Sequence, residues 1–353
     1  DSARHAGTPP FDGGLVVALG YGLGACLEPH ARVRRRPDEG ARAVILACDD
    51  AWCLDHASGA LHAVGSPPAL LPEAAPRAWG IDSLHADGTD AAYAAHVART
   101  VEYIRAGDAF QANVARRFSA EITGCARSLA HAAIVRNRAW FGGYLELPDG
   151  GALVSMSPEL FLRVRADGSC TTRPIKGTRP SDVCASELAT SEKDMAELAM
   201  IVDLMRNDLG RVAELGSVRV TEGRVLETHR TVHHGVAEIR AQLRPDAGWL
   251  DILRATFPPG SVTGAPKVRA MQIIDELEEH PRGFYCGAIG FIARSGNAAM
   301  NVAIRTAQLG APRSDGSRTA HYHAGCGIVA DSDPSSEVAE THAKTRAFAQ
   351  LVR

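Results

Sequence analysis

Strand-like apolar segments follow one another through the middle of this 353-residue sequence and then give way to one long amphipathic helix. GGYLEL, ALVSMSPELFLRVR and CTTRPIKG are three such segments, and turn residues separate them. Helical spacing begins in SEKDMAELAMIVDLMRNDLGRV, where an apolar stripe is formed by Leu198, Ile201, Val202 and Met205. Runs of strands followed by helices predict an α+β fold whose sheets are covered by outer helices.

The same pattern continues toward both ends of the chain. DAAYAAHVARTVEYIRAGDAFQANVARRFSA predicts a helix that ends at Gly107 and is followed by a strand. In the second half we expect strands near 217–228, 284–293, 298–309 and 319–330, and helices at 230–242, at 266–279 and from Pro334. Residues 66–90 are rich in Pro, Ala and Gly and predict a connector that leads into the helix of DAAYAAHVARTVEYIRAG. Residues 1–90 and 91–353 are expected to form one two-lobed unit.

Composition narrows the functional classes. The chain is 45% hydrophobic and 22% charged with a net charge of −3, which is typical of a globular protein and disfavours nucleic acid as a partner. No apolar run approaches the roughly 20 residues that span a bilayer, so we expect no membrane association. Eight cysteines without zinc-type spacing indicate reduced thiols and a cytoplasmic location. The first residue is Asp, so we expect further residues to precede it.

Two acidic pairs have the spacing of a metal site. Asp194 with Glu197, and Glu337 with Glu340, are each three residues apart on a predicted helix, which places both carboxylates of a pair on one face. Such carboxylates are natural ligands for Mg²⁺. Helix capping is the alternative for Asp194, which follows Ser191, and for Glu337, which lies in the first turn after Pro334.

Two further features predict anion binding. FPPGSVTGAPKVRAM is a loop-to-helix junction with exposed amides, and the alternative is that Thr263 or Gly264 simply caps the helix. NVAIRTA places Arg305 within an apolar strand, where an unpaired guanidinium would be costly, so we expect a carboxylate of the protein or of a ligand beside it.

Three other side chains have open interpretations. Lys176 in TTRPIKGTRP lies between a proline that fixes the backbone and a glycine that permits close approach, so its amine is either a surface charge or a reagent. Cys326 in HAGCGIVADSDP resembles a glutaminase nucleophile, but an apolar strand rather than a helix follows it, so we interpret it as a small strand residue. Of His233 and His234, the predicted helix at 230–242 directs only one inward.

These segments, in this order, resemble the chorismate-utilising enzymes from about residue 13 to the C-terminus. The resemblance is carried by AGDAFQANVARRF, SMSPELF, PIKGTRP, SEKDMAELAMIVDLMRNDLGRV, FPPGSVTGAPKVRAM, YCGAIGF, NVAIRTA and AGCGIVADSDPSSEVAETHAK. PIKGT is similar to the aminodeoxychorismate synthase component I branch, whereas anthranilate synthases place alanine at the lysine. Isochorismate and salicylate synthases carry a different lysine, as a water-activating base, on the strand that here contains Gln111 and Asn113.

The resemblance implies two large antiparallel sheets packed together and flanked by helices, with an active site between them. Residues 1–90 would be the N-terminal part of the sheet domain and 91–353 the chorismate-binding catalytic region. Mg²⁺ would be bound by Glu197 and Glu340, with Asp194 and Glu337 as outer or water-mediated ligands.

Roles for the remaining site residues also follow from the resemblance. The pyruvyl carboxylate of chorismate would be held by Arg305, Tyr285 and the Gly325 backbone. The substrate ring would be lined by Thr178, His234, Ser261, Thr263 and Gly264, of which His234 and Thr263 would assist catalysis.

The implied reaction converts chorismate and ammonia to 4-amino-4-deoxychorismate, toward para-aminobenzoate and folate. Burial near a metal ion would depress the pKa of Lys176 and let it attack C2, after which ammonia at C4 displaces it. A glutaminase subunit would supply the ammonia. Alternatives are anthranilate synthase component I, which Lys176 disfavours, and a non-catalytic chorismate-binding paralogue, which the intact Lys176, Glu197, Arg305 and Glu340 disfavour.

Overall fold

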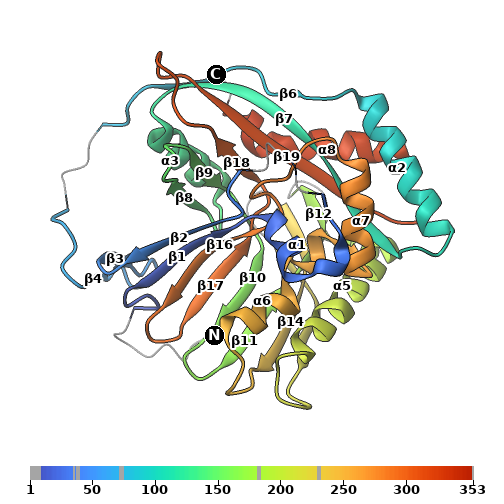
Figure 1. The fold of residues 1–353 in the computed structure, drawn as a ribbon, viewed down its shortest axis with the longest axis horizontal. Helices are drawn as coiled ribbons and strands as arrows, with labels where there is room; N and C mark the ends of the chain where they lie inside the picture. The colour runs from blue at the N-terminus through green and yellow to red at the C-terminus, as the bar shows by residue number, and fades with distance from the viewer. Residues whose placement is uncertain are drawn as a thin grey trace.

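Two large sheets dominate the computed structural model, which describes residues 9–34, 36, 40–70, 75–180, 184–228 and 232–351 (Figure 1). The first sheet has nine strands in the order β12 (Ile175–Pro180), β14 (Val232–Gln242), β11 (Ser169–Arg173), β10 (Leu160–Val164), β17 (Ala298–Val302), β16 (Ala288–Ala293), β1 (Gly14–Leu19) and β2 (Ala43–Cys48), with β13 (Arg219–Thr228) also paired to β14. The pairings between these described strands are antiparallel, which confirms the expected sheet type.

The second sheet has eight strands and is built around one long antiparallel pair of strands that are far apart in sequence. Its order is β15 (Gly264–Ala265), β7 (Gln111–Gly124), β19 (Arg318–Ile328), β18 (Thr306–Leu309), β9 (Ala152–Ser155) and β8 (Gly143–Glu146), with β5 (Trp79–Ile81) and β6 (His85–Ala86) also on β7. β7 and β19 pair over eleven residues, from Ala112 with Ile328 to Ile122 with Arg318. A separate ribbon is formed by β3 (Ala51–Leu54) and β4 (Leu61–Val64).

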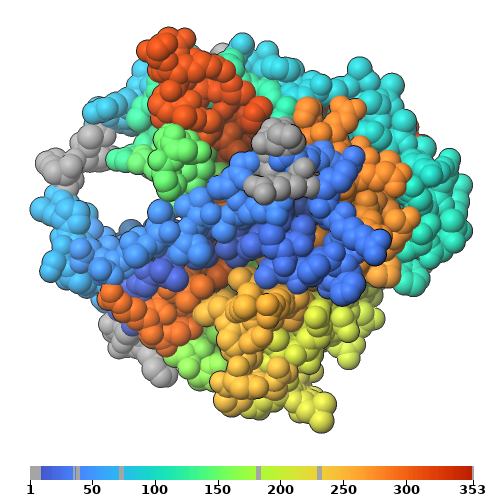
Figure 2. Space-filling model, in the orientation of Figure 1, coloured from blue at the N-terminus to red at the C-terminus, as the bar shows by residue number. Residues whose placement is uncertain are grey.

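The first ninety residues contribute strands to both sheets, because β1 and β2 join the first and β5 and β6 the second. Figure 2 shows this N-terminal segment, in blue, running across the front of the molecule. None of the helices in the described part of the chain has the length and apolar character needed to cross a membrane.

Helices cover both sheets and complete the α+β architecture. The longer ones are α2 (Asp90–Arg105), α3 (Ala126–Asn137), α5 (Glu192–Gly210), α6 (Trp249–Thr256), α7 (Lys267–Leu277) and α8 (Pro334–Ala349), and the short ones are α1 (Gly24–Leu27) and α4 (Ala185–Ala189). α5 packs on β14 and β12 of the first sheet, and α2 and α8 pack on β7 and β19 of the second. The predicted stripe of α5 is buried in the main core.

Capping fixes where the site-bearing helices begin. Ser191 accepts a hydrogen bond from the Asp194 amide at the start of α5, and Asp333 accepts one from the Ser336 amide at the start of α8. Pro334 occupies the first turn of α8, where its missing N–H costs nothing. These starts place Glu197 and Glu340 one turn inside their helices, where the Glu197 side chain is 15% exposed and the Glu340 side chain is 50% exposed.

The helix predicted at 230–242 is wrong, because Val232–Gln242 is strand β14. Its described residues from His233 to Ile239 are all buried, so the strand lacks the apolar–polar alternation that marks a half-exposed strand. Three strands, β11, β12 and β13, pair with it. Gly235 permits this pairing, because a Cβ there would lie 2.6 Å from the carbonyl oxygen of Lys176.

The strand predicted at 298–309 is also wrong as a single element. It divides into β17 and β18, which belong to different sheets, and Arg305 lies in the bend where the chain crosses from one to the other. Arg305 adopts a left-handed conformation with φ of 49°, which a non-glycine residue seldom takes. The guanidinium is therefore half-buried at the sheet junction and not inside an apolar strand.

Candidate active site between the two sheets

Lys176 lies where β12 of the first sheet meets β7 and β19 of the second. The β12–β14 register shifts between Ile175 and Thr178. Within this shift the residue at position 177 has a φ of 79°, a conformation that glycine adopts readily. Only 12% of the Lys176 side chain is exposed, and its Nζ lies 3.8 Å from Glu197 Oε2. The amine is therefore directed into the protein and is not a surface charge.

Glu159 is a buried acid that sequence reasoning missed. It is 3% exposed, directly before β10, and its Oε1 accepts a 2.6 Å hydrogen bond from Ser261 Oγ. Burial raises the pKa of Glu159 to about 7, although Ser261, Lys176 and Arg305 act to lower it. The available signal was the same as for Arg305, namely an ionisable residue within the apolar segment SMSPELF.

His234 and Thr178 form a cross-strand pair on β14 and β12. Thr178 Oγ1 and His234 Nδ1 are 2.9 Å apart, which fixes the orientation of an imidazole that is only 3% exposed. The pairing is a property of the strand register, so the helical interpretation of this segment concealed it. His234 lines a cavity of about 260 Å³ that also contains Arg305.

Arg305 is held toward this cavity without a carboxylate of its own. Among the described residues, none forms an ion pair with its guanidinium, although Met156 N donates a backbone hydrogen bond to its carbonyl oxygen. The cavity volume suits a small organic molecule. A half-buried guanidinium with no protein carboxylate at ion-pair distance among the described residues favours a carboxylate on the bound molecule.

The three predicted ring-lining residues of the loop before α7 are Ser261, Thr263 and Gly264, and each makes a different contact. Ser261 is bonded to Glu159, whereas Thr263 Oγ1 donates to the Pro259 carbonyl at 2.8 Å. Neither Thr263 nor Gly264 caps α7, which begins at Lys267 with Pro266 at the capping position and no side-chain cap. Gly264 instead pairs with Ala112 of β7 at a φ of 141°.

Tyr285 and Gly325 lie deeper and make other contacts. The Tyr285 ring stacks on His323 with centroids 5.2 Å apart, and burial raises its pKa well above the ordinary value. Lys344 Nζ donates a 2.7 Å hydrogen bond to the Gly325 carbonyl. Tyr285 is not among the described residues that line the Arg305 cavity.

Of the four predicted metal ligands, Glu337, Glu340 and Glu197 lie near one another, whereas Asp194 contacts an arginine. Glu337 and Glu340 of α8 have carboxylate oxygens within 4.8 Å of each other and of Cys326 Sγ. Glu197 faces them from α5: burial raises its pKa, the charges of Lys176 and Lys193 oppose that rise, and Asp194 and Glu340 add smaller upward effects. Asp194 is turned toward Arg179, at 2.9 Å from Nη2.

Lysine side chains stand among these carboxylates. Lys344 Nζ lies 2.7 Å from Glu340 Oε1, and Lys193 Nζ lies 3.8 Å from Glu337 Oε1. Burial disfavours ionisation of Glu340, but Lys344 and Lys193 lower its pKa overall. The cluster thus attracts positive charge from both helices.

Gln111 is a second buried polar residue for which the sequence predicted no role. It is 1% exposed, and neither Nε2 nor Oε1 has a hydrogen-bond partner among the described residues. A Cβ at Gly327 would collide with Gln111 Nε2 and lie 3.2 Å from Lys176 Nζ. The unsatisfied amide and the lysine therefore share one space beside a glycine.

Comparisons with known proteins agree with this arrangement. The sequence profile of chorismate binding enzymes matches residues 1–350. The aminodeoxychorismate synthase component 1 of Klebsiella aerogenes is 40% identical over 95% of this chain and 76% of its own length. The anthranilate synthase component 1 of Streptomyces coelicolor is 36% identical over 98% of this chain and 74% of its own.

A solved structure is similar over nearly the whole chain. Anthranilate synthase component I from Streptococcus pneumoniae matches with a TM-score of 0.84 and 29% identity, over 99% of this chain and 83% of that one. The fold of this chain is that expected from the sequence, two antiparallel sheets with flanking helices. The family profile, the relatives and the shared fold together show that this chain belongs to the chorismate-binding enzyme family.

Proposed function

We propose that this protein aminates chorismate at C4, giving 4-amino-4-deoxychorismate and water. The observation that carries the proposal is the largely buried Lys176 amine, which points into the space between the sheets beside Glu197. The chain is an enzyme of the chorismate-binding family, and relatives named aminodeoxychorismate synthase component 1 match most of its length. The product lies on the route to para-aminobenzoate and folate.

Lys176 acts as the nucleophile in the first step. Its Nζ forms a bond to C2 of chorismate, both ring double bonds shift, and the C4–O bond breaks. In the second step ammonia bonds to C4, both ring double bonds return to their original positions, and the C2–Nζ bond breaks. The lysine is thus regenerated, and the proton released by the incoming ammonia balances the one used by the leaving hydroxyl.

Glu159 supplies the proton to the leaving C4 hydroxyl. A pKa of about 7, caused mainly by burial, keeps a substantial fraction of this carboxyl protonated near neutral pH. Ser261 holds the carboxyl in place at 2.6 Å. Thr178 and His234 position the ring from the neighbouring strands β12 and β14, and Arg305 binds a substrate carboxylate.

The acidic cluster fits Mg²⁺ by its donor set. Glu197 and Glu340, with Glu337 close by, offer carboxylate oxygens. Lys193 and Lys344 form ion pairs with Glu337 and Glu340, which indicates that positive charge is favoured beside these carboxylates. Glu197 and Glu340 would hold the ion, and Asp194 and Glu337 would support it through water. When bound, the ion would neutralise the ring carboxylate of chorismate.

A glutaminase component supplies the ammonia in this proposal. Cys326, the residue that resembles a glutaminase nucleophile, is 1% exposed within strand β19, and burial raises its pKa to about 12. A thiol in that environment stays protonated and is a poor nucleophile. The relatives' designation as component 1 indicates that they work with a second component.

Product analysis tests the function directly. The protein is incubated with chorismate, Mg²⁺ and ammonium at alkaline pH, and the products are separated and identified by mass. We expect 4-amino-4-deoxychorismate without anthranilate. Fluorescent anthranilate would instead assign the chain to the anthranilate synthase activity of relatives such as that of Streptomyces coelicolor, and no turnover would favour a non-catalytic chorismate-binding paralogue.

A further inference from the structure

A buried ion pair lies behind the loop that carries Ser261, and the proposed reaction gives it no role. Glu278 directly follows α7, and Arg282 comes four residues later; the two are 6% and 3% exposed. The pair is a bidentate fork, because Arg282 Nε donates to Glu278 Oε2 at 2.9 Å and Nη2 donates to Oε1 at 2.6 Å. Removing two charges from water is costly, so a pair buried this deeply needs further partners for its other polar atoms.

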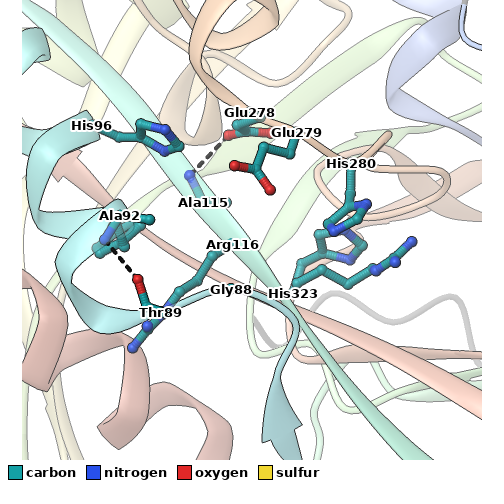
Figure 3. A pocket seen from close by; sticks show the side chains of 12 residues that line it. Gly88, Thr89, Ala92, His96, Ala115, Arg116, Glu278, Glu279, His280 and His323 are labelled. Carbon is teal, nitrogen blue, oxygen red and sulfur yellow. Dashed lines mark hydrogen bonds between the residues drawn. The ribbon is translucent and has the colours of Figure 1, made fainter.

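Those partners belong to two backbone segments that border the candidate active site. Glu278 Oε1 accepts a 2.8 Å hydrogen bond from the Ala115 amide of β7, which Figure 3 shows as a dashed line. Arg282 Nη2 donates to the Asn113 carbonyl of β7 at 2.5 Å, and Nη1 donates to the Val262 carbonyl at 3.2 Å. The ion pair therefore ties strand β7 to the loop before α7.

Val262 stands between two residues of the candidate site. Before it, Ser261 Oγ donates to Glu159 Oε1 at 2.6 Å, and after it the Thr263 carbonyl accepts a 2.8 Å hydrogen bond from the Asn113 amide. Within the loop, the backbone hydrogen bonds donated by Val262 N and Thr263 N are 3.3 Å long, beyond the usual range. These local bonds hold Ser261 weakly, and the guanidinium on the Val262 carbonyl supplies an additional anchor.

This anchor needs the shape of arginine as well as its charge. Four hydrogen bonds use four of the five N–H groups of the Arg282 side chain: two go to Glu278 and two to backbone carbonyls. Its Cζ lies 4.5 Å from the centre of the Tyr21 ring, which helps to fix the plane of the fork. A lysine has three donors on a flexible stem, so it can pair with Glu278 but cannot reproduce the planar fork on both carbonyls.

We propose that Glu278 and Arg282 are positioning residues for the reaction. By holding the Val262 carbonyl against β7, the pair fixes Ser261 in its hydrogen bond with Glu159. The inference rests on the proposed function, in which Glu159 protonates the leaving hydroxyl. Neither member of the pair is among the described residues that line the cavity of about 260 Å³, so the pair acts through Ser261 and not on the substrate. A misplaced general acid slows the chemical step more than it weakens substrate binding.

The Ser261 hydrogen bond can be followed without substrate through the pKa of Glu159. Burial raises this pKa, and the bond from Ser261 is the first of the effects that lower it, followed by the charges of Lys176 on β12 and Arg305 at the bend between the sheets. The Cys286 thiol is also close, but burial raises its pKa to about 12 and keeps it neutral near pH 7. Loss of the Ser261 bond alone should therefore raise the pKa of Glu159.

Three variants test the role of the pair. Arg282→Lys keeps the positive charge, so a changed pKa of Glu159 would report altered geometry. Glu278→Gln keeps the shape of the side chain but removes the charged fork. Lys267→Arg is the matched control, because it alters a buried ion pair, with Asp208 of α5 at 2.6 Å, that makes no hydrogen bond to the Ser261 loop.

The pKa is measured by nuclear magnetic resonance on the whole chain, labelled with ¹³C at the glutamate carboxyl carbons. Glu159→Gln identifies the signal of Glu159, and Ser261→Ala, alone and combined with Arg282→Lys, calibrates the loss of the hydrogen bond. For each variant circular dichroism checks the fold, and kcat and the KM for chorismate are measured with Mg²⁺ and saturating ammonium.

We expect Arg282→Lys and Glu278→Gln each to raise the pKa of Glu159, as Ser261→Ala does. Both should lower kcat by about tenfold or more and change the KM for chorismate by less than about twofold. Arg282→Lys should add no further effect to Ser261→Ala, because both act on one hydrogen bond. Lys267→Arg should leave the pKa of Glu159 unchanged.

An unchanged pKa of Glu159 in both variants of the pair would overturn the inference, and so would an equal rise in Lys267→Arg or additive effects of Arg282→Lys and Ser261→Ala. Unfolding of both variants would also overturn it, because the pair would then serve stability alone. If the pKa rises as expected but the unmodified protein forms no 4-amino-4-deoxychorismate, the proposed function is rejected while the hold on Ser261 stands.

Discussion

Replacing Glu159 by Gln should change stability in a way that depends on pH. The glutamine keeps the shape and can still accept the hydrogen bond from Ser261, but it carries no ionisable group. Burial raises the pKa of Glu159 from 4.5 to about 7 in the folded protein. At 1.36 kcal/mol per pKa unit, this rise corresponds to about 3.4 kcal/mol of lost folding free energy when the carboxylate is fully ionised.

The sign follows from proton binding. Below pH 4.5 both the folded and the unfolded chain hold the proton, so the raised pKa has no effect on stability. Between pH 4.5 and 7 the unfolded chain releases the proton while the folded chain retains it, so rising pH destabilises the fold. Integrated from pH 5 to pH 8, the loss is about 2.5 kcal/mol. The Glu159→Gln variant does not lose this stability, because its side chain does not ionise.

Denaturant unfolding at pH 5 and pH 8 measures this difference. The free energy of unfolding of Glu159→Gln, relative to the unmodified protein, should increase by about 2.5 kcal/mol between the two pH values. The control is Glu192→Gln, an exposed carboxylate on α5, for which we expect little change. At the same time kcat should fall by about 10² to 10⁴, as for loss of a general acid. If the stability difference between the variant and the unmodified protein were equal at both pH values, the hypothesis that burial keeps the Glu159 carboxyl protonated would be refuted.

Three further predictions concern the nucleophile, the metal and the nitrogen source. Lys176→Ala should lower kcat at least a thousandfold with little change in chorismate binding. Lys176→Arg should be equally inactive, because a guanidinium stays protonated. An active arginine variant in the same kinetic assay would contradict covalent catalysis. Glu197→Gln and Glu340→Gln should each remove most Mg²⁺-dependent turnover while circular dichroism shows an intact fold, whereas full activity in excess chelator would reject the metal site. Glutamine alone should support no product formation while ammonium does, and glutamine hydrolysis by the isolated chain would show that Cys326 is misinterpreted.

Elements with strong local signals could be predicted from the sequence. The buried stripe of α5, the Asp333–Pro334 start of α8 and the helix-to-strand passage ending at Gly107 are set by neighbouring residues. Ordered motifs indicated the chorismate-binding family, and the relatives and the shared fold confirm it. The candidate nucleophile and the acidic pairs could also be identified from the sequence, because each is a charged residue within a recognisable local motif.

The tertiary structure decided what depends on contacts distant in sequence. Residues 230–242 were predicted as a helix because a strand covered on both faces has no alternation, and only pairing with β11, β12 and β13 makes it β14. Arg305 lies at a crossing between sheets that no local pattern marks. The pKa of Glu159 and the unpartnered groups of Gln111 and His323 arise from burial by segments more than a hundred residues away. Local sequence therefore determines which groups exist, whereas long-range packing determines which of them are desolvated and face one another, since burial is a property of the whole fold.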